Sequence, residues 1–428
     1  MDRHWRFARA EDKLARLSKQ GLDMVAFWRA CAPVLADAVP SDAALCCFTL
    51  DPASGLVTSH FNEEMLVLPP EWIANEYMDD DVNKLTDVAR SPSGVSTLYE
   101  ATGGDPSSSP RWHALMADGG DQEMIAALRS RGDVWGAITM YRRLDRPLFD
   151  AYEQAFLAAV SPLMAAAVRR ALLIGESADP EGPEAPGMIV LGPDWRPESM
   201  SPGVEEWLRD LPDGNWAASR LPTAVLAVAG RAARSATGTD DPAEVAVARV
   251  LTRSGRWVVL HGVPLTAIDS QRVAVIVEPA HPSRIAPLLM SAYGLTEREQ
   301  QLTRLVLQGY STLDIADRLV ISVHTVQGHL RSIFTKTGVR ARRDLVTKIF
   351  FSHYEPRLRD NEQRTAANKP LRGGPAIATS PHHRPGQAQQ ARGRHLPTPC
   401  QEKAVACKQC ALVSASLWPG VARVPTPT

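Results

Sequence analysis

The sequence contains little of what a secreted or membrane protein needs. No apolar run approaches the roughly 20 residues of a membrane-spanning helix, and the first residues, MDRHWRFARAEDK, lack the apolar core of a signal peptide. Only six of the 428 residues are cysteine, and Cys31, Cys46 and Cys47 lie in apolar segments where free thiols pack as small hydrophobic groups. We therefore expect a cytoplasmic protein that does not associate with a membrane.

The sequence also lacks the short motifs of several enzyme classes. It contains no P-loop, no HExxH metalloprotease motif, no GxSxG nucleophile turn and no kinase signature. Asp79, Asp80 and Asp81 follow a helical pattern and are more typical of a solvated turn than of a metal site or a phosphate acceptor. Cys407 and Cys410 form a CxxC without a second well-spaced pair, which disfavours a zinc site. We expect no enzyme activity, no metal and no cofactor.

The net charge of −1 hides an uneven distribution of charged residues. Residues 295–350 contain nine Lys and Arg against five Asp and Glu, a net charge of +4. Residues after Phe350 contain eleven against four, a net +7, which leaves −12 for the remaining chain. An acidic body joined to a basic C-terminal module indicates a polyanionic partner for that module.

Hydrophobic periodicity divides the acidic body into two α+β modules, residues 1–175 and 187–280. Long helical patterns at Leu22–Ala38 and Phe149–Leu173 flank the first predicted sheet, and the Pro- and Gly-rich stretch GESADPEGPEAPG marks the boundary. Helical stretches at Ser201–Leu208 and Thr223–Arg234 accompany the second sheet. The expected strands are Ala43–Leu50, Leu56–Phe61, Glu123–Leu128, Val134–Tyr141, Met188–Leu191, Ala246–Thr252, Arg256–Gly262 and Arg272–Glu278.

The C-terminal module, residues 291–352, is predicted to be all helix and is joined to the body by Ile285–Met290. Four helices are expected, the last from about Ala341 to Phe350. Beyond them, residues 355–428 lack an apolar period and are rich in Pro, Gly and Gln, so we expect a disordered basic tail. The capping and terminating residues are Thr296 with Glu299, Gly309, Ser311, Ser322 and Gly338.

Two short helices joined by a tight turn, the second exposing polar groups, are typical of a helix-turn-helix. Gln327 and Arg331 share one face of the third helix, and their side chains can bind adenine and guanine edges bidentately. Gly328 between them permits close approach to a groove, and the arginines after the helix are placed for phosphates. The residues expected to contact DNA are Ser311, Thr312, Thr325, Gln327, Gly328, His329, Arg331, Arg340, Arg342 and Arg343. A helical bundle with merely solvated arginines is the disfavoured alternative.

About 55 residues resemble the LuxR-type helix-turn-helix, whose pattern combines LT-x-RE, S-x-x-[ED]-IA-x-x-L, S-x-x-TV-x-x-HL and GV-x-x-R. One position departs from it, because Gln327 stands where the family often has Lys, so the DNA sequence that the family recognises does not transfer. The resemblance implies dimer formation through the fourth helix. The matching residues are Leu295, Thr296, Arg298, Glu299, Gly309, Ser311, Asp314, Ile315, Ala316, Leu319, Ser322, Thr325, Val326, His329, Leu330, Gly338, Val339 and Arg342.

The first module resembles GAF-like sensory regions and the second a PAS-like domain, on element order and phrases such as DVWGAITMYR and RSGRWVVLHG. PPEWIANEYMDDD is similar to the pattern of autoinducer-binding domains, in which Trp72 and Tyr77 would line a ligand pocket; packing in the core of a sheet is the favoured interpretation of both, because aromatic side chains dominate cores. The sequence thus predicts a transcriptional regulator that binds double-stranded DNA as a homodimer and whose N-terminal modules either receive a signal, such as a small-molecule ligand, or mediate self-association. The alternatives are an enzyme that uses the helix-turn-helix only for targeting, and a protein-interaction module.

Overall fold

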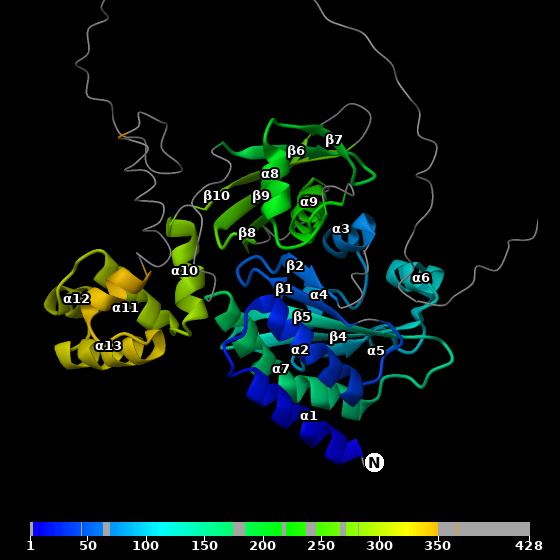
Figure 1. Ribbon diagram of the computed structural model, residues 1–428, viewed down its shortest axis with the longest axis horizontal. Coiled ribbons are helices and arrows are strands. Elements are labelled where there is room, and N and C mark those ends of the chain that lie inside the picture. Colours follow the sequence, from blue (N-terminus) through cyan, green and yellow to red (C-terminus); the bar gives the residue numbers. More distant parts are fainter. Residues whose placement is uncertain are drawn as a thin grey trace, which may run out of the picture.

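The computed structural model describes residues 3–349 except 44, 63–68, 174–184, 216–219, 237–244, 266–270 and 281, and in addition Ala366. Two five-stranded antiparallel sheets with their helices are followed by a helical domain (Figure 1). The predicted layout of two α+β modules and an all-α domain is therefore confirmed. The expected tail lies outside the described residues apart from Ala366, and the domain boundaries stay a prediction.

In the first module the strand order is β2-β1-β5-β4-β3. Side chains alternate along β1, so Cys47 faces the helices α1, α2 and α7 while Cys46 and Phe48 face the opposite side of the sheet. Both faces are covered, and all five residues of β1 are buried. The elements are α1 (Arg3–Leu17), α2 (Met24–Ala38), β1 (Cys46–Leu50), β2 (Val57–Phe61), α3 (Pro70–Met78), α4 (Leu85–Arg90), β3 (Val95–Thr97), α5 (Leu98–Ala101), α6 (Pro110–Ala117), β4 (Gln122–Ser130), β5 (Asp133–Arg142) and α7 (Ala151–Ala171).

The helix α7 is long and apolar enough to span a membrane by length and composition alone. Half of its most apolar window is buried inside the module, where Phe156, Val160 and Met164 pack with α1 and α2 in one core. This burial is what a core helix of a folded domain shows, and it makes the apolar composition weak evidence for a membrane span.

The second module repeats the strand order of the first, as β7-β6-β10-β9-β8. The predicted strands Ala246–Thr252 and Arg256–Gly262 pair as an antiparallel hairpin, with Leu251 of β8 opposite Trp257 of β9. The strand β7 was not predicted, because its four residues, PESM, are largely exposed and show no apolar alternation. The elements are β6 (Gly187–Leu191), β7 (Pro197–Met200), α8 (Val204–Asp210), α9 (Thr223–Ser235), β8 (Val247–Leu251), β9 (Trp257–Leu265) and β10 (Arg272–Pro279).

The two modules share a continuous hydrophobic core although the sequence between them predicts a boundary. The helix α9 is buried from Thr223 to Ala233, because it packs on its own sheet and also on α3 and β2 of the first module. A Cβ on Gly230 would lie 2.1 Å from the carbonyl oxygen of Ala74 in α3, so glycine permits this close approach. A buried ion pair between Arg249 and Asp51 adds a second link between the modules.

The helix α10 (Pro282–Ala292) extends the predicted connection and contributes to three cores. Ile285 and Leu289 pack against the second module, Ala292 against the first, and Met290 belongs to the core of the C-terminal domain. Just after α10, Arg131 donates a hydrogen bond to the carbonyl of Gly294. In Figure 1 α10 lies between the two sheets and the C-terminal domain, which stands to one side.

Candidate nucleic-acid interface

The C-terminal domain consists of α11 (Glu297–Leu307), α12 (Thr312–Leu319), α13 (Val323–Thr337) and a further helix over residues 342–349. The predicted caps are confirmed: Thr296 and Glu299 form a capping box, the Ser322 side chain accepts from Thr325 N, and Gly338 ends α13 with φ 70°. Ser311 caps α12 and, beyond the prediction, does so in a capping box with Asp314. The N-termini of α11, α12 and α13 are thus each capped by a residue that lies next to the helix in the sequence.

The turn between α12 and α13 centres on Val320, which has φ 53° and is 88% exposed. A β-branched residue rarely adopts this left-handed conformation. The turn is supported from α11, where Arg298 donates a hydrogen bond of 2.7 Å to the carbonyl of Leu319. The angle between the two helices is therefore held by a side chain outside both of them.

One face of α13 is buried and the opposite face is open. Val326 and Ile333 are fully buried in the domain core, whereas Gln327 and Arg331 are exposed and their side chains bond to no described residue. A Cβ on Gly328 would meet nothing within 4 Å, so no packing inside the chain requires glycine there. The structure therefore places these three residues, with Thr325 and the partly exposed His329, on or beside a surface that a duplex can reach.

Some of the residues predicted to contact DNA already have partners within the domain. Ser311 Oγ lies 2.6 Å from Asp314 Oδ2, and Thr325 Oγ1 lies 2.8 Å from Ser322 Oγ. Arg342 donates to the carbonyl of Tyr310, which ties the helix over 342–349 to the loop before α12. Three further predicted residues have no such bond in the described chain: Arg340 and Arg343 are exposed and Thr312 is partly exposed.

Sequence reasoning missed a buried polar cluster that joins α11 to α13. The Glu299 carboxylate accepts from the Lys336 ammonium and the Ser332 hydroxyl, both at 2.6 Å, and from Thr296 N at 2.7 Å. Burial alone would raise the pKa of Glu299, but these hydrogen bonds and the Lys336 charge lower it to about 2. The charge of Lys336 is therefore paired within the domain, and Ser332 faces Glu299.

Exposed apolar side chains also flank the turn, and the sequence analysis assigned them no role. Leu313 is 65% exposed on α12, and Val323 is 37% exposed at the start of α13. Apolar groups at such positions can contact the methyl group of thymine. An apolar residue outside the buried stripe of each helix is the signal that would have identified them.

The two residues predicted to line a ligand pocket separate in the structure. Trp72 lines a cavity between α3 and α6. Tyr77 is 1% exposed on another side of α3, where its hydroxyl donates to the Gly55 carbonyl and accepts from Val57 N. Core packing thus describes Tyr77, whereas Trp72 lines the cavity between α3 and α6.

Comparison with known proteins finds that residues 294–349 match the family model described as bacterial regulatory proteins, luxR family. Among solved structures, the chromophore-binding domain of a Stigmatella aurantiaca bacteriophytochrome is 16% identical, with a TM-score of 0.24 over 37% of this chain and 58% of that one. A bacteriophytochrome from R. palustris is 10% identical, with a TM-score of 0.25 over 64% and 62%. This chain thus spans less than two thirds of either bacteriophytochrome chain.

A Vibrio cholera VqmA–ligand–DNA complex contains a chain that is 16% identical, with a TM-score of 0.18 over 40% of this chain and 81% of that one. The family match covers the segment whose caps, turn and exposed helix face are described above. Residues 294–349 are therefore a DNA-binding helix-turn-helix domain of the luxR family of bacterial regulatory proteins.

Proposed function

We propose that the chain is a cytoplasmic, non-catalytic transcription regulator that inserts α13 into the major groove of an operator. The observation that carries the proposal is the open face of α13. Gln327 and Arg331 are one helical turn apart, exposed, and uncommitted to any described residue. Gln and Arg are side chains that bind adenine and guanine edges bidentately in this groove. Gly328 between them leaves room for the groove wall.

The flanking groups would fix the helix on the sugar–phosphate backbone. Arg340 and Arg343 are exposed beyond the end of α13, where they can contact phosphates. Arg342 acts differently in this proposal: its bond to the Tyr310 carbonyl positions the helix that carries its neighbours. Ser311 and Thr312 lie at the start of α12, where backbone N–H groups favour an anion.

The proposed assembly is a homodimer on a site with two half-sites, with the helix over residues 342–349 in the interface. A single domain of this size offers few base contacts, so pairing two of them raises affinity steeply. A signal received by the α+β modules would then change occupancy by changing how the two domains pair.

Arg331→Ala tests the base-reading part of the proposal. A duplex selected by the full chain from a random pool should bind this variant about 1–3 kcal/mol more weakly, because one bidentate base contact is lost. Binding to random duplex should change much less. The measurement is a titration of both duplexes at one salt concentration.

Arg29→Ala is the matched control, since Arg29 is an exposed arginine on α2 of the first module. It should leave both affinities unchanged. An equal loss on selected and random duplex in Arg331→Ala would show that Arg331 contacts only phosphate, and the base-reading assignment would then be wrong.

A further inference from the structure

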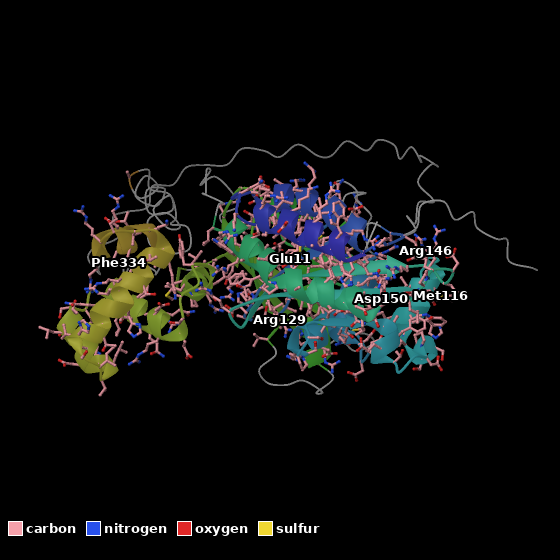
Figure 2. The ribbon with its side chains drawn as sticks, turned by 90° about the horizontal axis from the view of Figure 1, so that it is seen from below. Glu11, Met116, Arg129, Arg146, Asp150 and Phe334 are labelled. Atoms are coloured by element: carbon pink, nitrogen blue, oxygen red, sulfur yellow. The ribbon has the colours of Figure 1, made fainter. Side chains whose placement is uncertain are left out.

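A cavity of about 300 Å³ opens between α3 and α6 of the first module. This volume is at the lower end of the roughly 300–1,000 Å³ of small-molecule pockets, so the cavity can hold a small organic ligand. In Figure 2 Met116, which lies on α6, is at the opposite end of the molecule from Phe334 of α13. The cavity is thus remote from the DNA-binding surface.

Acidic side chains dominate the wall of this cavity. Glu71, Glu76, Asp79, Asp81 and Asp118 line it, and Arg111 is the only cationic residue among the described residues that line it. Anionic ligands would meet strong repulsion in such a site, whereas a cation would be attracted.

The positive charge of Arg111 is already neutralised. Its guanidinium pairs with Glu76 and, at 3.1 Å, with Glu123, and both of these carboxylates are almost completely buried. Asp81 is also committed, because it accepts from Ser109 Oγ at 2.9 Å and from Arg111 N at 2.7 Å at the start of α6. The ion pairs of Arg111 and the hydrogen bonds of Asp81 hold the wall of the cavity together, and the net charge of the wall stays negative.

The remaining three carboxylates have no side-chain hydrogen bond or ion pair within the described part of the chain: Glu71, Asp79 and Asp118. Burial raises the pKa of Asp118. Burial, with the nearby charges of Asp80 and Asp81, also raises the pKa of Asp79 in spite of Lys84 and Arg234. A cation in the cavity would add to the stabilisation that these two side chains give Asp79, and it would supply the stabilisation that Asp118 lacks.

An aromatic ring completes the wall. Trp72 is partly buried and packs edge-on against Tyr141 at a centroid distance of 6.1 Å. Indole faces attract ammonium groups, and Pro69, Pro110 and Ala114 add apolar surface beside it. Among the described residues no group of three His, Cys, Asp or Glu side chains could hold a metal ion. The carboxylates therefore surround a space instead of converging on a point.

We propose that the cavity binds a small organic cation, an amine that carries an apolar or aromatic body. The ammonium group lies near Asp79 and Asp118, and the body lies against Trp72. The helix α3 then carries the effect onward, because its opposite side contacts α9, where Arg234 pairs with Asp80 at 2.8 Å and donates to the Met78 carbonyl. Only this last step, control of DNA affinity, rests on the proposed function.

Three probes with the same phenyl ring, similar size and different charge test the proposal on the full chain without DNA. Phenethylamine is a cation, 2-phenylethanol is neutral and phenylacetate is an anion. Calorimetric titration should show binding of phenethylamine at micromolar to millimolar concentration, at least about tenfold tighter than 2-phenylethanol, and no binding of phenylacetate. Equal binding of the cation and the alcohol, or no binding of phenethylamine at millimolar concentration, would overturn the proposal.

Variants locate the binding in this cavity. Asp118→Asn and Trp72→Ala should each weaken phenethylamine binding by about tenfold, since one loses a charge and the other the aromatic wall. Asp145→Asn, at an exposed carboxylate of the same module, should have no effect. Circular dichroism checks that each variant is folded. Unchanged affinity in both folded cavity variants would place the binding elsewhere and refute the assignment.

A second titration separates this proposal from the function on which its last step rests. DNA affinity is measured without amine and then with saturating phenethylamine. Amine binding with unchanged DNA affinity would keep the cavity as a cation site and remove the sensory coupling. A chain that binds the amine but no duplex would contradict the proposed function and leave the cation site intact.

Discussion

At the scale of single residues, Glu299 shows how one side chain can serve two elements. It caps α11 through Thr296 N and holds Lys336 and Ser332 of α13. The exposed side of α13 is therefore oriented by a carboxylate on its buried side. Positioning of this kind fixes a binding helix more rigidly than packing alone.

The low pKa of Glu299 predicts a specific dependence of stability on pH. Its folded pKa of about 2 is below the ordinary value of 4.5, so its contribution is complete above about pH 4.5 and is lost as the pH falls toward 2. Glu299→Gln should destabilise the helix-turn-helix domain by about 1–3 kcal/mol at neutral pH. The difference from the natural protein should shrink as the solution is acidified.

Hydrogen exchange of the amides in α11 and α13 measures this local stability within the full chain. Glu297→Gln is the control, because Glu297 is an exposed carboxylate in the same first turn. A gap between Glu299→Gln and the natural protein that stays constant down to about pH 3 would contradict the role given to the ionised carboxylate.

Residue-scale prediction from sequence succeeded where the interaction is local. Thr296 and Ser322 bond to backbone groups three residues away, and a spacing of three is visible in the sequence. It failed where the partner is distant. The bond from Ser332 to Glu299 spans 33 positions and the bond from Arg342 to the Tyr310 carbonyl spans 32, so no local pattern indicates either bond.

At the scale of elements, α3 makes different contacts on its two sides. Trp72, Glu76 and Asp79 line the acidic cavity, while Ala74 and Tyr77 face away from it, toward α9 and its Arg231. Periodicity predicts that such a helix is amphipathic, but a helix covered on both sides has no single apolar stripe. Trp72 and Tyr77 were grouped by a resemblance between sequences, which does not show that the two residues lie on different sides of the helix.

Gly230→Ala should weaken the packing of α3 on α9. Its new Cβ would lie 2.1 Å from the backbone oxygen of Ala74, so the helices must move apart. We expect a loss of about 1–3 kcal/mol in the free energy of unfolding, as for overpacked cores. Chemical denaturation of the full chain, followed by the fluorescence of its tryptophans, measures it.

Gly328→Ala is the matched control for this change. Gly328 is also a helical glycine, but its Cβ would meet nothing within 4 Å. Replacing an exposed helical glycine by alanine should stabilise the domain by up to about 1 kcal/mol. If Gly230→Ala were as stable as Gly328→Ala, the close approach of α3 and α9 would be ruled out.

At the scale of the whole molecule, the tip between β4 and β5 touches the chain just before the helix-turn-helix. Asp133 accepts from the Ser291 hydroxyl, and Arg131 donates to the Gly294 carbonyl. Gly294 has φ 71°, and a Cβ there would collide with the guanidinium groups of Arg131 and Arg169. The first module therefore restrains the segment that leads into the DNA-binding domain.

Asp133→Ala should release this restraint. The amides around Ser291 and Gly294 are expected to exchange with solvent about tenfold faster, since a partly buried hydrogen bond is lost. Asp145→Ala, an exposed acidic change in the same module, should leave exchange there unaltered. Unchanged exchange of these amides in Asp133→Ala would contradict the role given to Asp133, because other contacts would then restrain the segment.

The placement of α10 has a practical consequence for dividing the chain. If the chain is divided after Met290, the helix-turn-helix fragment loses the Met290 side chain from its core. If it is divided before Ile285, the second module loses the side chains of Ile285 and Leu289. A fragment that begins at residue 291, the boundary that the sequence favours, would lack a buried side chain of the helix-turn-helix core. Weak DNA binding by such a fragment would then reflect its incomplete core. It would not show that the intact domain needs a second subunit or the N-terminal modules to bind DNA.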